Sequence, residues 1–529
     1  MLARWVARIT TGDLPSRPIA FALFAVWLCL EVILVRHHAF WRDEVRALSL
    51  ATQGDLVSMI ESLRGEGHPA LWYLLLRGGY FLAGSPAVLW IISLGIAAAA
   101  ALLLVLRAPF GWPLLALLLL SRVFIFEYSV MARNYGIGML LMFLFAACYR
   151  TYRDRAMVLG FLLFLLANTH VLCALLVGAF LLFWSIDVVI RHGVRWTAPV
   201  KTFLLNATIA AVGVIVCFIT VYPPSADLIP AGLQKSIEFK QIASAVIEPS
   251  RNFEVLSGLR YWEMMGLGQF GTIVMSLVLV GSTFGLVRSP GAFIAALGSL
   301  IGFSLFFVIV YPDHYRQEAL WFIFLVTMYW IVHKGGAPSD HPRLVSRPML
   351  WASRFGLILM VLLVTAQFMG GLRAVADLYE NVQQSRSRDL SQLIKSRPDL
   401  NNAVIIADPD YLLEALPYYI DNPLCFMRER KFGKVVSFTR AAQLNLTLDD
   451  VLNVAKQLNQ EGGRPVIILM AQRLDPAQSA VTYQESYNWS LSVTSEQLRR
   501  FLASAQLLAR FAPARSDESY DVYLLDQSR

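Results

Sequence analysis

Long apolar runs fill the first 372 residues of the 529-residue chain, whereas the remainder alternates short apolar and polar stretches. A helix needs about 20 apolar residues to cross a bilayer, so runs near this length predict membrane-spanning helices. We therefore expect a mostly α, polytopic membrane protein with about eleven transmembrane helices. The expected spans are residues 18–35, 86–106, 110–127, 134–149, 156–169, 171–190, 203–222, 272–288, 291–311, 318–333 and 352–372.

Two further helical patterns lie between the first two spans. Residues 43–53 carry an apolar stripe with an acidic start. Residues 69–84 contain Arg77, three glycines and several aromatic side chains that suit the membrane–water interface. We predict that both lie in the interface as amphipathic helices rather than crossing the membrane.

The charge pattern sets the expected orientation. The net charge of +8 divides into 27 basic and 18 acidic residues in 1–372, and 18 and 19 in 373–529. With eleven spans, 15 basic and 4 acidic residues fall on the side of the N-terminus, against 12 and 13 on the other side of the membrane half. Basic loops are typically cytoplasmic, so the N-terminus is expected inside and the C-terminal part outside. The basicity is thus a topology signal and not evidence for nucleic-acid binding.

The first span is expected to be a retained anchor. It contains Glu31 and lacks a small-x-small cleavage site before His37, unlike a secretory signal peptide. Only 16% of the chain is charged and 57% is hydrophobic, which excludes an ordinary soluble enzyme. A bacterial inner membrane protein with an outer, periplasmic domain fits these features.

The C-terminal part, 373–529, reads as a separate soluble α/β domain that follows the membrane domain 1–372. A helical connector is expected over 373–400. Beyond it, β-like runs alternate with helix-like runs, as in a layered α/β domain. The β-like runs are 403–407, 435–438, 465–470 and 520–525, and the helix-like runs are 410–420, 447–460 and 494–509. This domain is expected to shape an acceptor site or to dock a partner.

Polar and ionisable residues near membrane segments gather on the outer side in the derived topology. Such residues are costly there and tend to mark function. The candidates are Asp43, Glu44, His68, Arg133, Tyr135, His170, Asp313, His314, Tyr315 and Arg316.

Asp43 and Glu44 are the candidate acid/base residues. A carboxylate in a partly desolvated site can accept a proton from an attacking hydroxyl or amine. The alternative is structural, because carboxylates also stabilise the N-terminus of a helix. The position of the pair directly after the first span favours the catalytic interpretation.

Arg133, Tyr135, Tyr315 and Arg316 are candidates for binding an anionic group. Guanidinium groups match phosphate oxygens bidentately, and tyrosine adds a hydroxyl. The alternative is interfacial anchoring, since Tyr and Arg are common at the headgroup level.

The remaining candidates are weaker. His68, followed by Pro69, orients a substrate group or merely starts a helix. His170 binds substrate or is a solvated turn residue, and Asp313 with His314 belongs to the same outer turn as Tyr315. No cofactor is certain, although two carboxylates and nearby histidines are compatible with a divalent metal.

Four sequence motifs together resemble the GT-C class of integral-membrane glycosyltransferases. They are WRDEVRALSLA, EGHPALWYLLL, ARNYG and DHYRQEALWF, and the resemblance covers about residues 20–370. This class includes bacterial aminoarabinose and galacturonic acid transferases of lipid A and protein O-mannosyltransferases. The chain departs from the pattern where His68-Pro69-Ala70 lacks a second proline, and where Tyr315-Arg316 reverses the usual order.

The resemblance implies a sugar donor carried on polyprenyl phosphate and an inverting transfer in which Asp43 is the base. The acceptor would be lipid A, the lipopolysaccharide core, another envelope glycan or a protein. The competing hypothesis is a transporter or flippase of a lipid or glycolipid, which predicts repeats, broken helices and midplane charges. The third hypothesis is a non-catalytic envelope-assembly or sensor protein.

Overall fold

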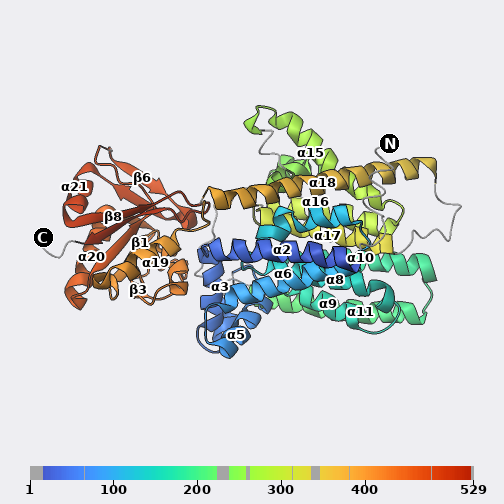
Figure 1. The fold of residues 1–529 in the computed structure, drawn as a ribbon, viewed down its shortest axis with the longest axis horizontal. Coiled ribbons are helices and arrows are strands. Elements are labelled where there is room, and N and C mark those ends of the chain that lie inside the picture. The colour runs from blue at the N-terminus through green and yellow to red at the C-terminus, as the bar shows by residue number, and fades with distance from the viewer. Residues whose placement is uncertain are drawn as a thin grey trace.

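The computed structural model describes residues 16–64, 66–222, 238–257, 263–312, 314–334, 346–380, 382–477 and 479–525. A helical bundle occupies one end of the elongated molecule and a strand-containing domain the other (Figure 1). Helix α18 (Arg347–Tyr379) runs along the bundle and reaches the second domain. The protein is thus mostly α, with a C-terminal α/β domain.

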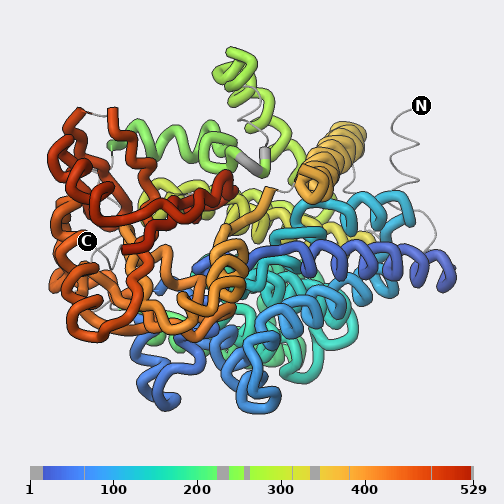
Figure 2. The backbone as a smooth tube through the Cα atoms, turned by 60° about the vertical axis from the view of Figure 1, so that its left-hand side comes forward, coloured from blue at the N-terminus to red at the C-terminus, as the bar shows by residue number. Residues whose placement is uncertain are grey.

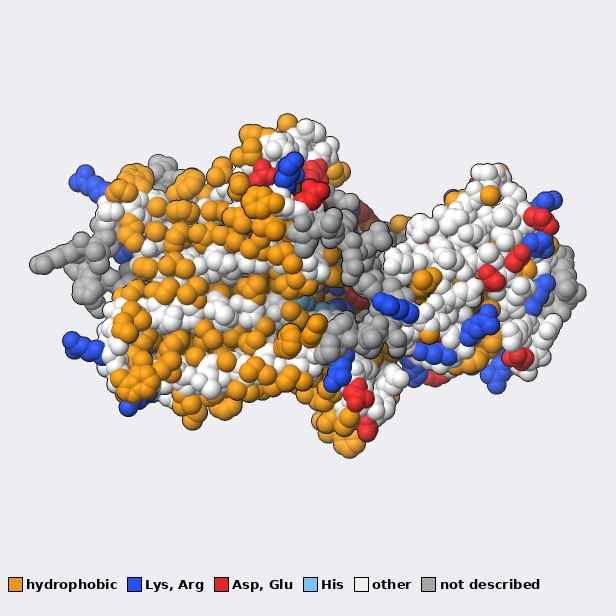
Figure 3. Space-filling view, turned by 180° about the vertical axis from the view of Figure 1, so that it is seen from behind, with side chains coloured by type: hydrophobic (Ala, Val, Ile, Leu, Met, Phe, Trp, Pro, Cys, Tyr) orange, Lys and Arg blue, Asp and Glu red, His pale blue; other side chains and the backbone are white. Residues whose placement is uncertain are grey.

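Each of the eleven expected spans coincides with a helix. Among the described residues, seven helices are long and apolar enough to cross a membrane: α2 (Arg17–His37), α6 (Val88–Arg107), α10 (Val171–His192), α11 (Ala198–Val221), α15 (Gly268–Thr283) with η3 (Phe284–Leu286), α16 (Pro290–Ile309) and α18. The others are α7 (Trp112–Leu119) with the π-helical turn η1 (Val123–Glu127), α8 (Tyr135–Tyr152), α9 (Val158–Ala167) and α17 (Tyr315–Lys334). The protein is a multi-pass membrane protein, and apolar side chains cover the face of the bundle in Figure 3.

Two of these segments differ from simple spans. Helix α9 has 10 residues, so it is about 15 Å long and shorter than the hydrocarbon layer. Helix α7 ends at Leu119, and the chain resumes as η1 at Val123. The break coincides with a close approach of α18, whose Gly371 lies against the Leu120 carbonyl.

Three helices form the segment between the first two spans: α3 (Arg42–Thr52), α4 (Leu56–Ser62) and α5 (Leu71–Ala83). They lie at the end of the bundle that faces the α/β domain (Figure 1). Helix α5 has 13 residues and exposes Phe81 and Leu82 almost completely, as the interfacial interpretation predicts. Its Arg77 donates hydrogen bonds to the carbonyls of Ala51 and Gly54, which fixes α5 to the end of α3.

A second group of short elements precedes α15. These are α12 (Phe239–Ile247), η2 (Pro249–Asn252) and α13 (Glu254–Ser257). They pack on α15, α16 and α17, near the same end of the bundle.

The α/β domain is built on a four-stranded sheet in the order β1-β5-β9-β8. β1 and β5 are parallel, whereas β9 pairs antiparallel with both β5 and β8. A second sheet has the order β4-β7-β6, and β2 pairs with β3. The strands are β1 (Val404–Asp408), β2 (Cys425–Phe426), β3 (Lys431–Phe432), β4 (Asn445–Thr447), β5 (Val466–Met470), β6 (Val481–Gln484), β7 (Ser490–Val493), β8 (Ala505–Phe511) and β9 (Tyr520–Leu525).

Helices and 3-10 turns connect the strands, and an apolar core lies on each face of the main sheet. They are α19 (Ser387–Ser396), η5 (Pro398–Leu400), η6 (Asp410–Tyr418), α20 (Leu448–Gly462), η7 (Ser486–Asn488) and α21 (Ser495–Ser504). β1 is buried on both sides, with Ile405 in one core and Ile406 in the other. A continuous apolar run is the expected signature of such a strand.

Two sequence predictions in this domain are wrong. Residues 435–438 do not form a strand, because the Val436 and Ser437 amides donate to the carboxylates of Glu414 and Glu429 instead of to a neighbouring strand. The helix expected over 494–509 ends at Ser504, and the chain continues as β8 because it pairs along β9. Tertiary pairing thus overrides local helix propensity there.

The α/β domain packs directly on α3, and Figure 2 shows it beside the segment that holds this helix. The Phe40 amide donates to the Tyr419 hydroxyl at 2.7 Å, and the Arg42 amide donates to Glu518 at 2.8 Å. Arg46 is ion-paired with Glu414. Helix α3 is therefore enclosed between the bundle and the C-terminal domain.

Candidate active site

Helix α3 brings its first turn to the boundary between the bundle and the α/β domain. Glu44, the third residue of the helix, accepts a hydrogen bond from the Trp41 amide at 2.9 Å and so satisfies the free N-terminus. Val45, Leu48 and Ala51 are buried in the core of the bundle. This anchoring leaves Asp43 on a different side of the helix, since successive helical residues point about 100° apart.

Asp43 forms an ion pair with Arg133, whose Nη1 lies 2.7 Å from its Oδ2. The Asp43 side chain keeps 32% of its surface exposed, so a substrate can reach it. Burial raises the pKa of Asp43, but Arg133, Arg42 and Arg316 outweigh it and hold this pKa below its usual value. The carboxyl group is therefore ionised at neutral pH.

Glu44 is in a different environment from Asp43. Its carboxylate is fully buried and contacts His38 Nε2 at 2.9 Å. One oxygen also accepts a hydrogen bond from the Ala132 amide at 2.7 Å. Glu44 thus joins α3 to the loop before α8, and its carboxylate is enclosed on the side away from Asp43.

Arg133 connects Asp43 to His68. Its Nη2 lies 2.9 Å from His68 Nε2. Burial and the neighbouring Arg133 charge hold the pKa of His68 well below its usual value, so this ring is neutral. A neutral imidazole can accept the guanidinium hydrogen bond and keep Arg133 oriented.

His170 lies beside His68, with the ring centroids 5.1 Å apart. The His170 side chain caps α10 by accepting a hydrogen bond from the Leu172 amide at 3.1 Å. Burial, reinforced by Arg133, lowers the pKa of His170 to about 3. Tyr135 packs on the same ring at 5.2 Å, so all three side chains line one wall behind Arg133.

Arg316 forms the second cationic group near Asp43. Its guanidinium lies over the Trp41 ring at 4.7 Å from the centroid and forms an ion pair with Glu127 at 3.2 Å. The Tyr128 hydroxyl donates to the Arg316 carbonyl at 2.7 Å. These contacts fix the start of α17 next to α3.

The other candidates of the 313–316 turn are less closely involved. Tyr315 is buried and donates to Gln367 at 2.6 Å, with Arg122 stacked on its ring at 4.4 Å. His314 is exposed, with its ring 5.8 Å from that of Tyr311. Asp313 lies outside the described residues. The structure therefore brings Asp43, His68, Arg133, Tyr135, His170 and Arg316 together, and leaves Tyr315 behind them.

The C-terminal domain adds aromatic residues that sequence reasoning did not find. Tyr411, Phe438, Tyr487 and Trp489, here called the aromatic cap, stack on one another. Arg42 lies 4.1 Å from the Tyr411 ring centroid, and Arg46 lies 5.2 Å from that of Phe438. The cap therefore covers the face of α3 next to Asp43.

Strained backbone occurs within this cap. Phe438 has φ 48° and Tyr487 has φ 61°, in the left-handed region that bulky residues rarely adopt. Such residues cost about 1–3 kcal/mol each and tend to cluster at functional sites. The one sequence signal was Asn488, a residue type common in tight hairpin turns.

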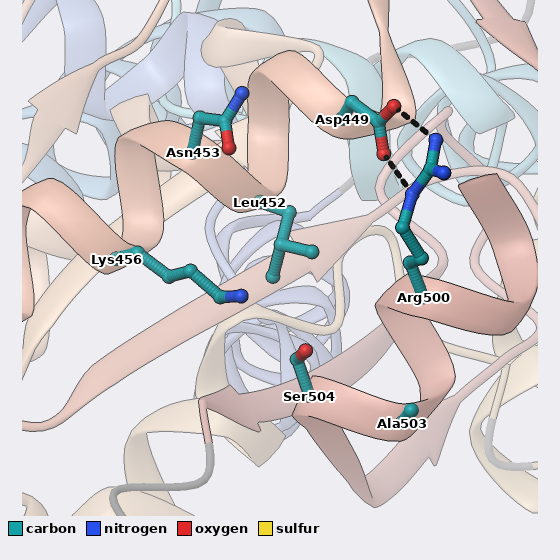
Figure 4. A pocket seen from close by; sticks show the side chains of 7 residues that line it. All are labelled: Asp449, Leu452, Asn453, Lys456, Arg500, Ala503 and Ser504. Atoms are coloured by element: carbon teal, nitrogen blue, oxygen red, sulfur yellow. Dashed lines mark hydrogen bonds and ion pairs between the residues drawn. The ribbon is translucent and has the colours of Figure 1, made fainter. Parts of the chain in front are cut away.

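Two hollows lie outside this cluster. A shallow pocket of about 350 Å³ lies between α20 and α21, lined by Asp449, Lys456 and Arg500 among others (Figure 4). Arg500 is held by Asp449 across it. A second hollow of about 40 Å³ lies where α2 and α18 meet the C-terminal domain. Neither contains the residues around Asp43.

Among the residues that the structure describes, no group of three His, Cys, Asp or Glu side chains is arranged to hold a metal ion. Asp43 and Glu44 face different surroundings, so they do not converge on one point. The adjacent positive charges of Arg133 and Arg316 disfavour a cation and favour an anion beside Asp43.

Two solved structures are among those to which the chain is similar. Both are of ArnT from Cupriavidus metallidurans, one bound to undecaprenyl phosphate and one in the apo state. Each is 14% identical; they align with 97% and 96% of this chain and 99% and 98% of theirs, with TM-scores of 0.45 and 0.44. No family model and no curated protein matches the chain.

Proposed function

We propose that this protein is a membrane glycosyltransferase that uses a sugar linked to polyprenyl phosphate. The observation that carries the proposal is Asp43, a reachable carboxylate held ionised by Arg133 next to a second guanidinium, Arg316. A base and anion-binding groups within one site at a membrane boundary suit the transfer of a group away from a phosphate. The motif resemblance to GT-C enzymes supports the same chemistry.

In the proposed reaction, Asp43 accepts the proton of an acceptor hydroxyl or amine. The acceptor atom forms a bond to the anomeric carbon while the bond from that carbon to the phosphate oxygen breaks. The phosphate oxygen leaves with the electron pair, and Arg133 and Arg316 stabilise its negative charge. Attack from the face opposite the leaving group inverts the anomeric configuration.

The proposed roles of the other residues follow from their contacts. Glu44 positions α3 and does not touch substrate, because its carboxylate is enclosed by His38 and two backbone amides. His68 orients Arg133 as a neutral acceptor. Tyr135 and His170 form the wall that excludes water behind it.

We propose that the site faces the periplasm of a bacterium. The candidate residues gather at the bundle end that faces the C-terminal domain, and Lys and Arg side chains project from the opposite end (Figure 3). A basic end is typically cytoplasmic. A lipid-linked donor would serve an outer site, where nucleotide sugars are lacking. The acceptor is then an envelope lipid, glycan or protein, with lipid A or the lipopolysaccharide core favoured.

The broken helix α7–η1 is the observation that favours the alternative, a lipid transporter or flippase. One experiment separates the two functions. The purified full chain is incubated with undecaprenyl-phosphate-linked sugars and an envelope lipid extract, and released undecaprenyl phosphate and glycosylated product are measured.

We expect the wild-type chain to transfer sugar and Asp43→Asn to lower the rate 10²- to 10⁴-fold, the usual contribution of a general base. Asp55→Asn is the matched control, because Asp55 caps the exposed start of α4 and Asn is an equally good cap. It should transfer at the wild-type rate. The absence of transfer by any donor, or an unchanged rate in Asp43→Asn, would contradict the proposal.

A further inference from the structure

The tip of the β6–β7 hairpin has a backbone that its sequence does not favour. The last strand pair is Gln484 with Ser490, and the Trp489 amide donates to the Ser486 carbonyl at 3.3 Å. Tyr487 (φ 61°, ψ 28°) and Asn488 (φ 58°) are both left-handed, which makes a type I′ turn. Asn suits such a turn, but a bulky tyrosine at its first central position does not.

Packing holds Tyr487 in this conformation. Its ring stacks on Phe438, with centroids 3.8 Å apart and planes 19° apart. Phe438 in turn packs on Trp489 at 5.6 Å and on the Arg46 guanidinium. The strained turn therefore places one ring at a defined position over α3.

A buried ion-pair network fixes the residues on both sides of this turn. Arg428 is fully buried and donates to Asp408 at 2.7 Å and to the Ser490 carbonyl at 3.2 Å. It also lies 3.6 Å from Glu485, the residue that opens the turn. The turn is thus anchored to the core of the C-terminal domain, and it cannot move relative to that core without breaking these contacts.

The hairpin tip packs, through Phe438, on the face of α3 that carries Asp43. Asp43 and Arg46 are three residues apart on α3 and therefore share one face of the helix. Phe438 covers Arg46 on that face, and Tyr487 stacks on Phe438. Burial raises the pKa of Tyr487, and the charges of Arg46 and Asp43 also act on it. Arg133 approaches Asp43 from the loop before α8 in the membrane domain. Tyr487 belongs to the C-terminal domain and approaches α3 from the other side.

We propose that Tyr487 is an acceptor-binding residue, whose hydroxyl holds the acceptor beside Asp43. The inference rests on the proposed function, which assigns the donor phosphate to Arg133 and Arg316 in the membrane domain. The acceptor then enters between α3 and the aromatic cap.

The charges on this side indicate the class of acceptor. Arg46 is paired with Glu66 and Glu414, and Arg42 with Asp517. The cations nearest to Tyr487 are therefore already paired with carboxylates on this side of the site, so they add little attraction for an anionic acceptor. Recognition by a tyrosine hydroxyl suits an uncharged hydroxyl group, such as that of a sugar, rather than a phosphate or carboxylate.

The test compares Tyr487→Phe with Tyr483→Phe in the purified full chain. Tyr487→Phe keeps the ring stack and the turn but removes the hydroxyl; Tyr483 lies on β6 of the same hairpin and serves as the matched control. Transfer is measured at varied acceptor concentration, using envelope glycolipids with and without phosphate groups, together with thermal unfolding.

We expect Tyr487→Phe to raise the KM for the acceptor about 10-fold, the effect of about 1.4 kcal/mol. The KM for the donor and the unfolding temperature should stay at wild-type values, and Tyr483→Phe should keep the wild-type KM for both substrates. The rise should occur with acceptors that lack phosphate near the attacked hydroxyl. A second variant, Tyr487→Asn, suits the turn better but removes the ring, so it should lose transfer without a matching loss of stability.

Three outcomes would overturn the inference. An unchanged acceptor KM in Tyr487→Phe would do so while leaving the proposed function intact. An equal loss of stability and transfer would assign Tyr487 a structural role. If the wild-type chain transfers no sugar at all, the proposed function fails and this inference fails with it.

Discussion

Arg133 is the residue on which the charge state of the site depends most. One of its nitrogens is paired with Asp43 and the other contacts His68. Among the charges that lower the pKa of Asp43, that of Arg133 is the largest. A base with a depressed pKa stays ionised at acidic pH, so the rate should not fall until the pH is well below neutral.

Arg133→Gln is therefore expected to move the acidic limb of the pH–rate profile. Without Arg133, the largest charge that opposes burial is lost and the pKa of Asp43 rises. As the pH is lowered, protonation of the base should therefore reduce the transfer rate at a higher pH in the variant than in the wild type. The measurement is transfer rate between pH 4 and 8, where the variant should lose proportionally more activity at the acidic end.

Arg373→Gln is the control for this prediction, because Arg373 is exposed and pairs with Asp377 and Glu380 at the end of α18. Its profile should match the wild type. An acidic limb that does not move in Arg133→Gln would show that Asp43 is not the titrating base.

At the same scale, the sequence identified the Asp-Glu pair but did not separate its members. Hydropathy and position in the chain are the same for two adjacent carboxylates, so they do not indicate which one is the base. Only the helix geometry distinguishes them, because it turns Asp43 toward Arg133 and Glu44 toward His38. Tyr487 was not predictable, since its place depends on its stack with Phe438 and on the docking of Phe438 on Arg46 of α3.

At the scale of elements, the long apolar helices were predictable because each carries its own signal. The failures occur where structure depends on distant partners. β8 is a strand because β9 lies beside it, and residues 435–438 lose their strand to side-chain carboxylates. The short strands β2, β3 and β4 contain two or three residues each, too few for an alternating pattern.

Close helix contacts support one prediction at this scale. A Cβ atom added to Gly371 of α18 would lie 2.0 Å from the Leu120 carbonyl oxygen, at the break between α7 and η1. Gly371→Ala must therefore separate α18 from η1, whose Glu127 holds Arg316. We expect a loss of about 1–3 kcal/mol in stability, typical of overpacking, and a lower transfer rate.

Gly95→Ala on α6 is the matched control, since nothing lies within 4 Å of its added Cβ. It should be neutral or stabilise by up to about 1 kcal/mol, because Ala favours the helix. Thermal unfolding of both variants in the same detergent checks the difference. Equal unfolding temperatures would mean that α18 does not approach η1 this closely.

At the scale of the whole molecule, the candidate site depends on two parts of the chain: the apolar helical bundle and the C-terminal α/β domain. The bundle supplies Arg133, His170 and Arg316 from segments far apart in sequence, which the topology brings to one end. The C-terminal domain closes that end through Arg42, whose amide donates to Glu518, 476 positions away. Docking of the domain is thus a requirement for a complete site.

This docking should weaken as the pH rises. Burial, opposed by Arg42, raises the pKa of Glu518 to about 8, and burial opposed by Arg46 raises that of Glu414 to about 7. Both carboxyls lie at the contact with α3, and both values exceed the usual one near 4.5. Between the usual pKa near 4.5 and these raised values, the docked state keeps protons that the undocked state releases. A higher pH therefore favours undocking.

Each extra proton held by the docked state changes its stability by up to about 1.4 kcal/mol per pH unit. Glu518→Gln keeps an acceptor for the Arg42 amide but cannot ionise, so its stability should fall less steeply between pH 6 and 8 than that of the wild type. The remaining slope comes from Glu414 and from Asp410 and Glu485, whose pKa values burial also raises, to about 8. Thermal unfolding of the full chain at each pH measures this difference. The control is Glu496→Gln, on the exposed surface of α21, which should show the same dependence of stability on pH as the wild type. If Glu518→Gln and the wild type lose stability equally over this range, Glu518 is ionised in the docked state and the interface does not respond to pH through it.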